Sequence, residues 1–327
     1  MHYSSKFLCA LSVLVALTAC KKDEPDPVET PNDPTPQAMP QACKDPATDP
    51  GPDGPGLVFK FRFNNQQQRL NNFGLPANLP TAHAGQSPQF NGISAHYIEL
   101  APSAFTALGT GEIIFNGPET AAGGASALDF DQAIVKGQCE DFIRIPFSQI
   151  NEGTYPWIRV SLAYQNYDIE YLWNGNMYTG TVASFIGFNN YITSYNINNE
   201  TIEVNGNRLQ GYWGFETTMT FLGVDYTETV TGQAPEGATT VPNPLFDSSP
   251  IPAGSCVVTG PFDNPLQITG NETEDIVIVL SLSTNKSFEW IDVNGDGKYE
   301  PLNASFQATG EVPVDMGVRG LEIYVNP

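Results

Sequence analysis

The clearest pattern in this chain is a strict alternation of apolar and polar residues that begins after Gly56. Apolar side chains fill every second position from Leu57 to Phe63, and Lys60 and Arg62 stand between them. A period of two is typical of a β-strand with one buried face. The same alternation returns at 96–100, 142–145 and 157–164. We therefore expect a body built from half-buried strands.

Two Asn-Gly pairs in the middle of the chain, Asn174-Gly175 and Asn205-Gly206, are each flanked by strand-like segments. Asparagine and glycine both tolerate positive φ, so this pair favours a two-residue turn between antiparallel strands. The two pairs therefore predict two hairpins in a β-meander.

The segment 275–283 is almost continuously Ile, Val and Leu, which is typical of a central strand buried on both faces. A further alternating segment follows at 321–325, and no stretch shows a sustained 3.6-residue apolar stripe. The predicted fold is all-β, an antiparallel β-sandwich-like body with a candidate second, smaller β unit at its C-terminal end.

Composition divides the chain into four parts. Residues 1–19 form an apolar leader, and 20–55 are rich in Pro and Asp with few large apolar side chains. A segment of that kind cannot bury a core, so 20–55 is expected to be a disordered tether. A run of Gly and Pro at 231–254 predicts a linker between a sandwich-like domain at 56–250 and a C-terminal β unit at 251–327.

The formal net charge is −22, from 36 acidic and 14 basic residues. Contacts to phosphate groups need clustered Lys and Arg, so nucleic acid is excluded as a partner. The acidic balance suits solubility outside the cell and contact with divalent cations, but it does not identify a ligand.

The N-terminal residues have the pattern of a targeting signal. Lys6 precedes an apolar run that ends at Leu17, and Thr18-Ala19-Cys20 follows. The run of about 11 apolar residues is too short for a transmembrane helix, which needs roughly 20. Its position after a basic residue and before small residues is typical of a secretory signal peptide. Leu17 to Cys20 resembles the lipobox of bacterial lipoproteins. That resemblance implies cleavage before Cys20 and attachment of acyl chains to its thiol, which would anchor the protein to a membrane. The alternative is an ordinary secretory signal peptide, in which Cys20 stands by chance and is not acylated.

Lys21-Lys22-Asp23-Glu24 follows the lipobox at once. This segment resembles the export signal of Bacteroidota-type surface lipoproteins, which implies an outer-membrane protein that faces the medium. Attachment to the periplasmic leaflet of the outer membrane is the alternative.

Three cysteines remain for disulfide formation once Cys9 leaves with the signal and Cys20 is acylated. An odd number in an oxidising compartment predicts one bridge and one unpaired thiol, with three pairings open. We favour Cys139–Cys256, because each follows a glycine-containing turn in the body, whereas Cys43 lies in the predicted tether.

One segment has the spacing of a calcium loop. Asp292, Asn294 and Asp296 supply side-chain oxygens at alternate positions, and Gly297 follows them. Side chains two apart in a curled loop converge on one centre, so this spacing suits a calcium ion. The backbone carbonyl of Lys298 and the side chain of Glu300 complete the predicted ligands. Asn303 stands where an EF-hand has its bidentate glutamate, and a plain polar turn is the alternative.

No nucleophile elbow, zinc helix or phosphate loop occurs in the sequence. No catalytic residue is therefore assigned, and His96 is expected to be a core histidine because it alternates in phase with Ile98. Four aromatic residues are candidates for a platform that stacks against sugars: Trp173, Tyr178, Tyr212 and Trp213.

The sequence thus favours a non-enzymatic, lipid-anchored surface protein whose β-rich body binds an extracellular glycan or protein and holds a structural calcium ion. A secreted polysaccharide hydrolase that uses two carboxylates is one alternative, and a structural or adhesion protein of the cell surface is another.

Overall fold

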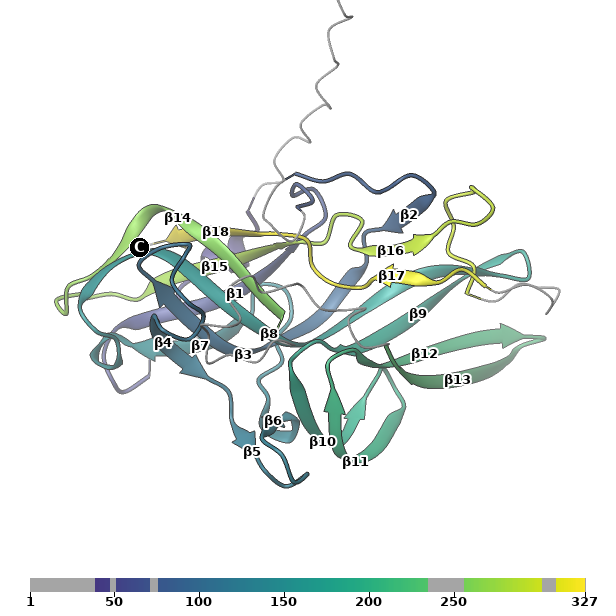
Figure 1. Ribbon diagram of the computed structural model, residues 1–327, viewed down its shortest axis with the longest axis horizontal. Helices are drawn as coiled ribbons and strands as arrows, with labels where there is room; N and C mark the ends of the chain where they lie inside the picture. Colours follow the sequence, from purple (N-terminus) through teal and green to yellow (C-terminus); the bar gives the residue numbers. More distant parts are fainter. Residues whose placement is uncertain (1–38, 48–50, 71–75, 235–255, 302–309, 327) are drawn as a thin grey trace, which may run out of the picture. The chain divides into compact units, whose positions relative to one another are not determined.

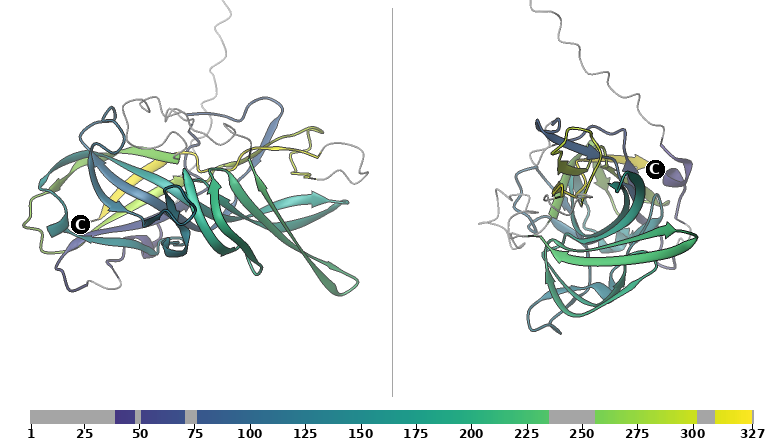
Figure 2. Two further views of the ribbon diagram at one scale, coloured as in Figure 1. Left: turned by 60° about the horizontal axis from the view of Figure 1, so that its bottom comes forward. Right: turned by 90° about the vertical axis from the view of Figure 1, so that its right-hand side faces the viewer.

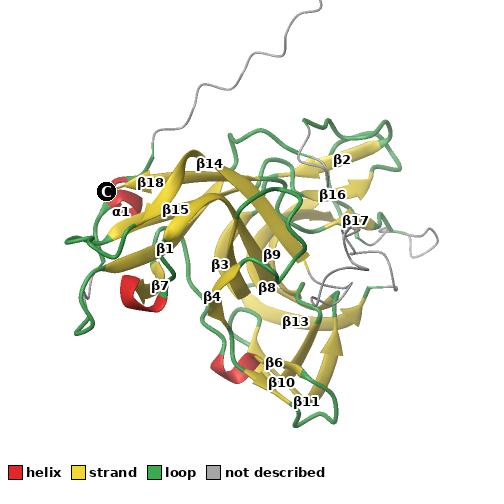
Figure 3. Ribbon diagram, turned by 60° about the vertical axis from the view of Figure 1, so that its left-hand side comes forward, coloured by secondary structure: helices red, strands yellow, loops and turns green. Residues whose placement is uncertain are grey.

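β-Strands make up most of the described residues (Figure 3). The computed structural model describes residues 39–47, 51–70, 76–234, 256–301 and 310–326, all of which belong to one unit that spans Thr35–Pro327. Helix in these segments is limited to one α-helical turn and two 3-10 turns, which are α1 (Gln41–Lys44), η1 (Phe130–Gln132) and η2 (Phe147–Gln149). The predicted all-β class is confirmed.

The largest sheet has seven strands and is strongly curved (Figure 2). Its order is β13 (Val224–Gln233), β12 (Tyr212–Phe221), β9 (Asn176–Phe185), β8 (Gly153–Trp173), β3 (Gln89–Ala101) and β4 (Glu112–Asn116), with β14 (Cys256–Ile268) also paired to β8. All of these pairings are antiparallel.

A four-stranded sheet has the order β18 (Leu321–Asn326), β15 (Ile276–Ser283), β1 (Gly56–Asn64) and β7 (Asp141–Pro146). Its two central strands, β1 and β15, run parallel although more than 200 residues separate them along the chain. Both are buried on both faces, as the apolar run at 275–283 predicts for β15.

Two smaller sheets complete the described part of the chain (Figure 1). One is formed by β11 (Thr201–Leu209), β10 (Asn189–Asn196), β6 (Ala127–Asp129) and β5 (Glu119–Thr120), and the other by β17 (Pro313–Asp315), β16 (Phe288–Ile291) and β2 (His83–Gln86).

The main core lies between the four-stranded sheet of β1 and β15 and the seven-stranded sheet. Apolar side chains of β1 and β15, such as Phe59 and Leu280, pack in one cluster with Ile98 of β3 and Val160 of β8. Burial of these side chains away from water is the main stabilising contribution to a sandwich of this kind.

The prediction of a half-buried strand at 57–63 is wrong, because the polar face of β1 is also buried. Lys60 and Arg62 are only 3% and 2% exposed. Residues from the N-terminal side cover part of this face, and the ammonium group of Lys60 donates to the carbonyl oxygen of Ala42 at 3.0 Å. The same ammonium group pairs with Asp141 of β7 at 3.0 Å. A buried ammonium group needs such partners.

One of the two Asn-Gly predictions is confirmed. Asn174 and Gly175 have φ values of 50° and 78° and form the two-residue turn between β8 and β9. Asn205-Gly206 instead lies inside β11, where the register with β10 shifts between Ile192 and Ser194. The positive φ of Asn205 therefore serves a β-bulge rather than a hairpin turn.

The predicted domain limits also need correction. Residues 39–47 and 51–55, assigned to the tether, contact the body: Phe147 donates its N–H to the carbonyl oxygen of Pro55 at 3.0 Å, and Cys43 is fully buried. The strands that follow residue 255 pair with β1 and β8, so they form no separate C-terminal unit. Residues 20–38 and the predicted limit at 250/251 lie outside the described residues.

The disulfide joins Cys43 to Cys139, across a sequence separation of 96 residues, so the predicted Cys139–Cys256 bridge is wrong. Cys139 donates its N–H to Phe61 of β1 at 2.7 Å, which places it against the same strand that the segment around α1 covers. Cys256 begins β14 opposite Leu162 and is a free thiol. Burial raises the pKa of this thiol to about 11, so it is protonated at neutral pH.

Candidate functional site

One face of the seven-stranded sheet carries a series of aromatic and apolar side chains across β8, β9, β12 and β13. The ladder sets Tyr167 opposite Val182, Val182 opposite Phe215, and Phe215 opposite Val230. Residues two apart on a strand share a face. We define the aromatic face as Tyr167, Tyr171, Trp173, Tyr178, Val182, Trp213, Phe215, Tyr226 and Val230.

Two glycines let rings of this face lie across the sheet. A Cβ atom at Gly180 would come within 2.3 Å of the Phe215 ring, and one at Gly232 within 2.4 Å of the Trp213 ring. Each ring therefore occupies the space that a side chain on the neighbouring strand would fill. Trp213 and Phe215 are both half-buried, so part of each ring remains accessible for contacts above the sheet.

The aromatic face is covered at β8 and opens toward β13. Near β8 it packs against Phe288 and Trp290 of β16, and Tyr171 is 4% exposed. Burial raises the pKa of the Tyr171 hydroxyl, which lies 2.9 Å from the Thr217 hydroxyl. On β13, Tyr226 and Val230 are 54% and 44% exposed. The strands β12 and β13 form the end of the sheet at the lower right of Figure 1.

Trp173 and Tyr178 lie between these extremes, beside the turn that joins β8 to β9. Their ring centres are 6.2 Å apart, and both side chains are half-buried. Trp213 is also half-buried. These three residues, predicted as ligand-binding from the sequence, therefore share the aromatic face.

Tyr212 does not belong to this group, although the sequence suggested it. Its ring lies on the opposite face of β12, is 7% exposed and packs against Phe185 and Tyr195 with ring-centre separations of 5.7 and 6.0 Å. Neighbouring residues on a strand point to opposite faces, so Tyr212 and Trp213 could not both join one platform. The sequence reasoning missed Phe215 and Tyr226, which the alternation along β12 and β13 could have indicated.

The charge around the aromatic face is negative. Arg208 is the one basic residue between positions 160 and 234 of the sequence, and its guanidinium group lies 5.0 Å from the Tyr212 ring on the opposite face. Glu228, which is exposed, sits on the aromatic face between Tyr226 and Val230. The face therefore disfavours anionic ligands and accepts neutral or cationic ones.

A buried carboxylate, that of Glu216, lies on the face of the sheet opposite the aromatic face. Glu216 on β12 is 2% exposed. Its oxygens accept the N–H groups of Asn198, Asn199 and Glu200 at 2.9–3.1 Å. These residues form the turn between β10 and β11, so the carboxylate fixes that hairpin against β12 behind the aromatic face.

The loop after β16 has the curled form expected from its sequence. The Asp292 carboxylate accepts the N–H groups of Gly295 and Gly297 at 2.8 and 3.0 Å, and the Asn294 side chain accepts that of Asp296 at 2.9 Å. Gly295 and Gly297 have φ values of 75° and 72°. The loop follows the strand β16 and not a helix, unlike the loop of an EF-hand.

A carboxylate that the sequence reasoning missed closes this loop. Glu311 is 6% exposed and accepts the N–H groups of Val293 and Glu300 at 3.0 and 2.8 Å. Burial raises the pKa of Glu311, although these two hydrogen bonds lower it, and the charges of Asp292 and Glu300 raise it further. In the described part of the chain, no group of three or more His, Cys, Asp or Glu is arranged to hold a metal ion.

The other buried acids of the described residues have structural partners. Glu99 accepts the N–H groups of Gly109 and Gly111 at 3.1 and 2.6 Å and lies 3.7 Å from Arg159. Glu289 pairs with Arg69 and contacts the His83 ring nitrogen Nδ1 at 2.5 Å. Each of these carboxylates therefore helps to hold a loop or a strand in place.

His96 is a buried core residue, as expected. Its side chain contacts Glu119 through Nε2 at 2.9 Å and lies beside Phe188, with ring centres 5.3 Å apart. Burial lowers the pKa of His96, and the Glu119 carboxylate only partly offsets this.

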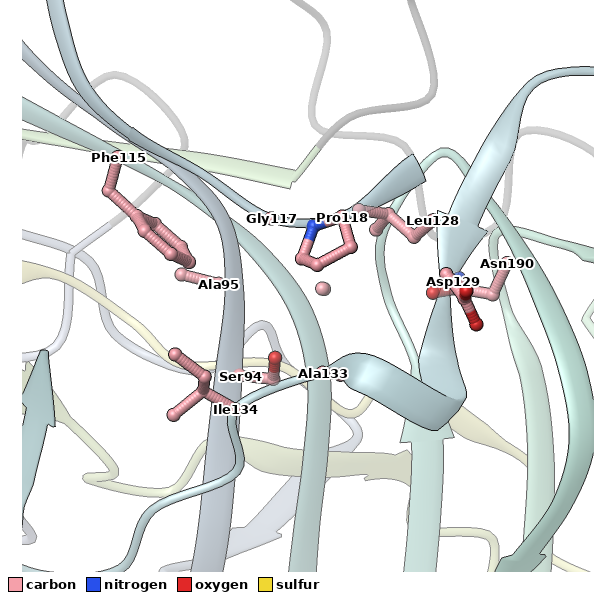
Figure 4. A pocket seen from close by; sticks show the side chains of 11 residues that line it. Ser94, Ala95, Phe115, Gly117, Pro118, Leu128, Asp129, Ala133, Ile134 and Asn190 are labelled. Carbon is pink, nitrogen blue, oxygen red and sulfur yellow. The ribbon is translucent and has the colours of Figure 1, made fainter. Parts of the chain in front are cut away.

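A small cavity lies between β3, β6 and β10 (Figure 4). Ser94 and Asn190 line it, and their polar side-chain atoms have no hydrogen-bond partner among the described residues. Its size suits about one buried water molecule rather than an organic ligand.

Comparisons of the chain with protein-family models, curated proteins and solved structures found no match. None of the helices in the described residues has the length and apolar character needed to cross a membrane. The predicted lipidation site, Cys20, lies outside the described residues.

Proposed function

We propose that this protein is a lipid-anchored protein of the bacterial outer membrane, exposed at the cell surface, that binds an extracellular glycan through the aromatic face. The observation that supports this most strongly is the arrangement of Phe215 and Trp213, whose rings lie across Gly180 and Gly232. The anchor rests on the lipobox and export signal at residues 17–24.

Flat rings on a rigid sheet suit a sugar. The face of an aromatic ring carries partial negative charge, so it attracts the C–H groups that line one side of a pyranose ring. A sheet holds such rings in place before the ligand arrives, which reduces the entropy lost on binding. Because Glu228 is the charged residue among these rings, the favoured glycans are neutral or carry amino groups.

The test is a glycan array probed with the purified protein and two variants. Trp213→Ala combined with Tyr226→Ala removes two rings of the aromatic face, and we expect it to lose the glycans that the wild-type protein retains. Thr227→Ala changes the neighbouring residue of β13 on the opposite face and should leave the pattern unchanged. Equal retention by all three proteins, or retention of sulfated and uronate glycans alone, would contradict the proposal.

We further propose that the loop 292–300 binds a structural calcium ion. Asp292, Asn294 and Asp296 supply side-chain oxygens, and Lys298 and Glu300 supply a backbone carbonyl and a carboxylate. Calcium that binds only the folded protein must raise the unfolding temperature. Millimolar calcium should therefore raise the melting temperature above that in EGTA, and Asp292→Ala should abolish the increase. No difference between calcium and EGTA would refute the proposal.

A further inference from the structure

The strand β13 is an open edge of the seven-stranded sheet. Among the described residues it pairs with β12 and with no other strand. Nine of its ten residues are exposed, and the exception is Gly232. Val224 to Gln233 contains no Pro and no Lys, the residues that most often protect a free edge. A long, unprotected edge is a template for an additional strand.

The turn between β12 and β13 determines which backbone groups of β13 point away from β12. Leu222 and Gly223, with φ values of 52° and 77°, form a two-residue turn, so Phe221 and Val224 are a hydrogen-bonded pair. Such pairs alternate along an antiparallel ladder. Even-numbered residues of β13 therefore bond to β12, whereas Asp225, Thr227, Thr229, Thr231 and Gln233 direct their N–H and C=O groups to the open edge.

We propose that this edge binds an extended segment of a partner protein that carries Lys or Arg, which adds to the sheet as a strand beside β13. The side chains of an added strand would lie next to Tyr226, Glu228 and Val230 on the aromatic face. The exposed Glu228 carboxylate would place a negative charge beside the middle of the added strand. The matching segment therefore alternates as apolar, basic and apolar residues at every second position.

A second copy of this chain fits the edge less well. β13 contains Asp225 and Glu228 and no basic residue, and the whole chain carries a net charge of −22. Pairing two copies through β13 brings no positive charge to either carboxylate, so repulsion opposes it. Charge complementarity favours a basic partner.

Hydrogen exchange with a synthetic probe tests the geometry. The probe is the blocked peptide Thr-Val-Thr-Lys-Thr-Val-Thr, and the control peptide has Glu in place of Lys. In the free protein, the N–H groups of Thr227, Thr229 and Thr231 should exchange faster than those of Tyr226 and Glu228. The probe should slow the fast set, and the control peptide should bind about fivefold more weakly at low salt.

Two variants separate edge pairing from attraction by charge alone. Thr229→Pro removes an outward N–H without disturbing the bonds to β12 and should weaken probe binding about tenfold or more, whereas Thr229→Ala should keep it. The proposal is overturned if Thr229→Pro binds the probe as well as the wild-type protein, or if no binding occurs. It is also overturned if sedimentation shows a dimer that Thr229→Pro dissociates, since the occupant would then be a second copy. Glycan binding through the aromatic face could fail in each case without changing these results.

Discussion

Replacing Glu216 with alanine should destabilise the sheet that supports the aromatic face. The variant removes the carboxylate that accepts the N–H groups of Asn198, Asn199 and Glu200. A hydrogen bond to a charged group contributes about 1.5–3 kcal/mol. The three donors belong to exposed residues, so water can replace part of what is lost. We therefore expect a loss of about 3 kcal/mol in unfolding free energy, less than the roughly 4.5 kcal/mol that three such bonds would contribute at the lower end of the range.

Glu216→Gln should cost less, about 1.5–2 kcal/mol, because the amide keeps one acceptor oxygen but turns an NH₂ group toward the donors. Urea unfolding with the disulfide intact measures both losses, and hydrogen exchange at residues 198–200 should become faster in both variants. Glu203→Ala is the matched control, since Glu203 is exposed on β11 and its loss should change stability by less than about 0.5 kcal/mol. If Glu216→Ala behaves like this control, the assignment of Glu216 as an anchor is wrong.

Three other predictions concern stability. Replacing Cys43 and Cys139 together with serine opens a bridge across 96 residues, and urea unfolding should show a loss of about 2–4 kcal/mol. The pKa of His96 is lowered by burial, so the unfolded chain binds more protons than the folded protein as the pH falls below 6.5. The melting temperature should therefore fall with pH in that range, and His96→Phe should reduce the slope. Gly175→Ala places a Cβ at a φ of 78°, and urea unfolding should show a cost of about 1–2 kcal/mol.

Local patterns predicted the strands well because alternation depends on neighbouring residues only. The apolar run at 275–283 indicated burial on both faces, and β15 has it. The parallel pairing of β15 with β1 could not be predicted, because no local signal links strands so distant in the chain. The burial of Lys60 was missed for a related reason: the segment that covers it has a composition typical of a tether, and its disulfide to Cys139 holds it against the body.

The candidate site was predicted in part. Trp173, Tyr178 and Trp213 lie on one face of the sheet, but Tyr212, which the sequence reasoning grouped with them, lies on the opposite face. The alternation along β12 contained that information. The role of Gly180 and Gly232 could not be predicted from the sequence. The rings of Phe215 and Trp213 lie over these glycines from a neighbouring strand, and the strand pairing was not known. Glu311 was missed because it lies 18 and 11 residues along the chain from Val293 and Glu300, whose N–H groups it accepts.

Calorimetric titration of the strongest array glycan into two single variants of β13 tests the central claim most directly. Tyr226→Ala removes a ring of the aromatic face, and Thr227→Ala alters the next residue on the opposite face. We predict that Tyr226→Ala weakens binding roughly three- to tenfold, the loss expected for one aromatic contact, and that Thr227→Ala leaves the affinity unchanged. Unchanged affinity in Tyr226→Ala, or an equal loss in both variants, would contradict a glycan site on the aromatic face.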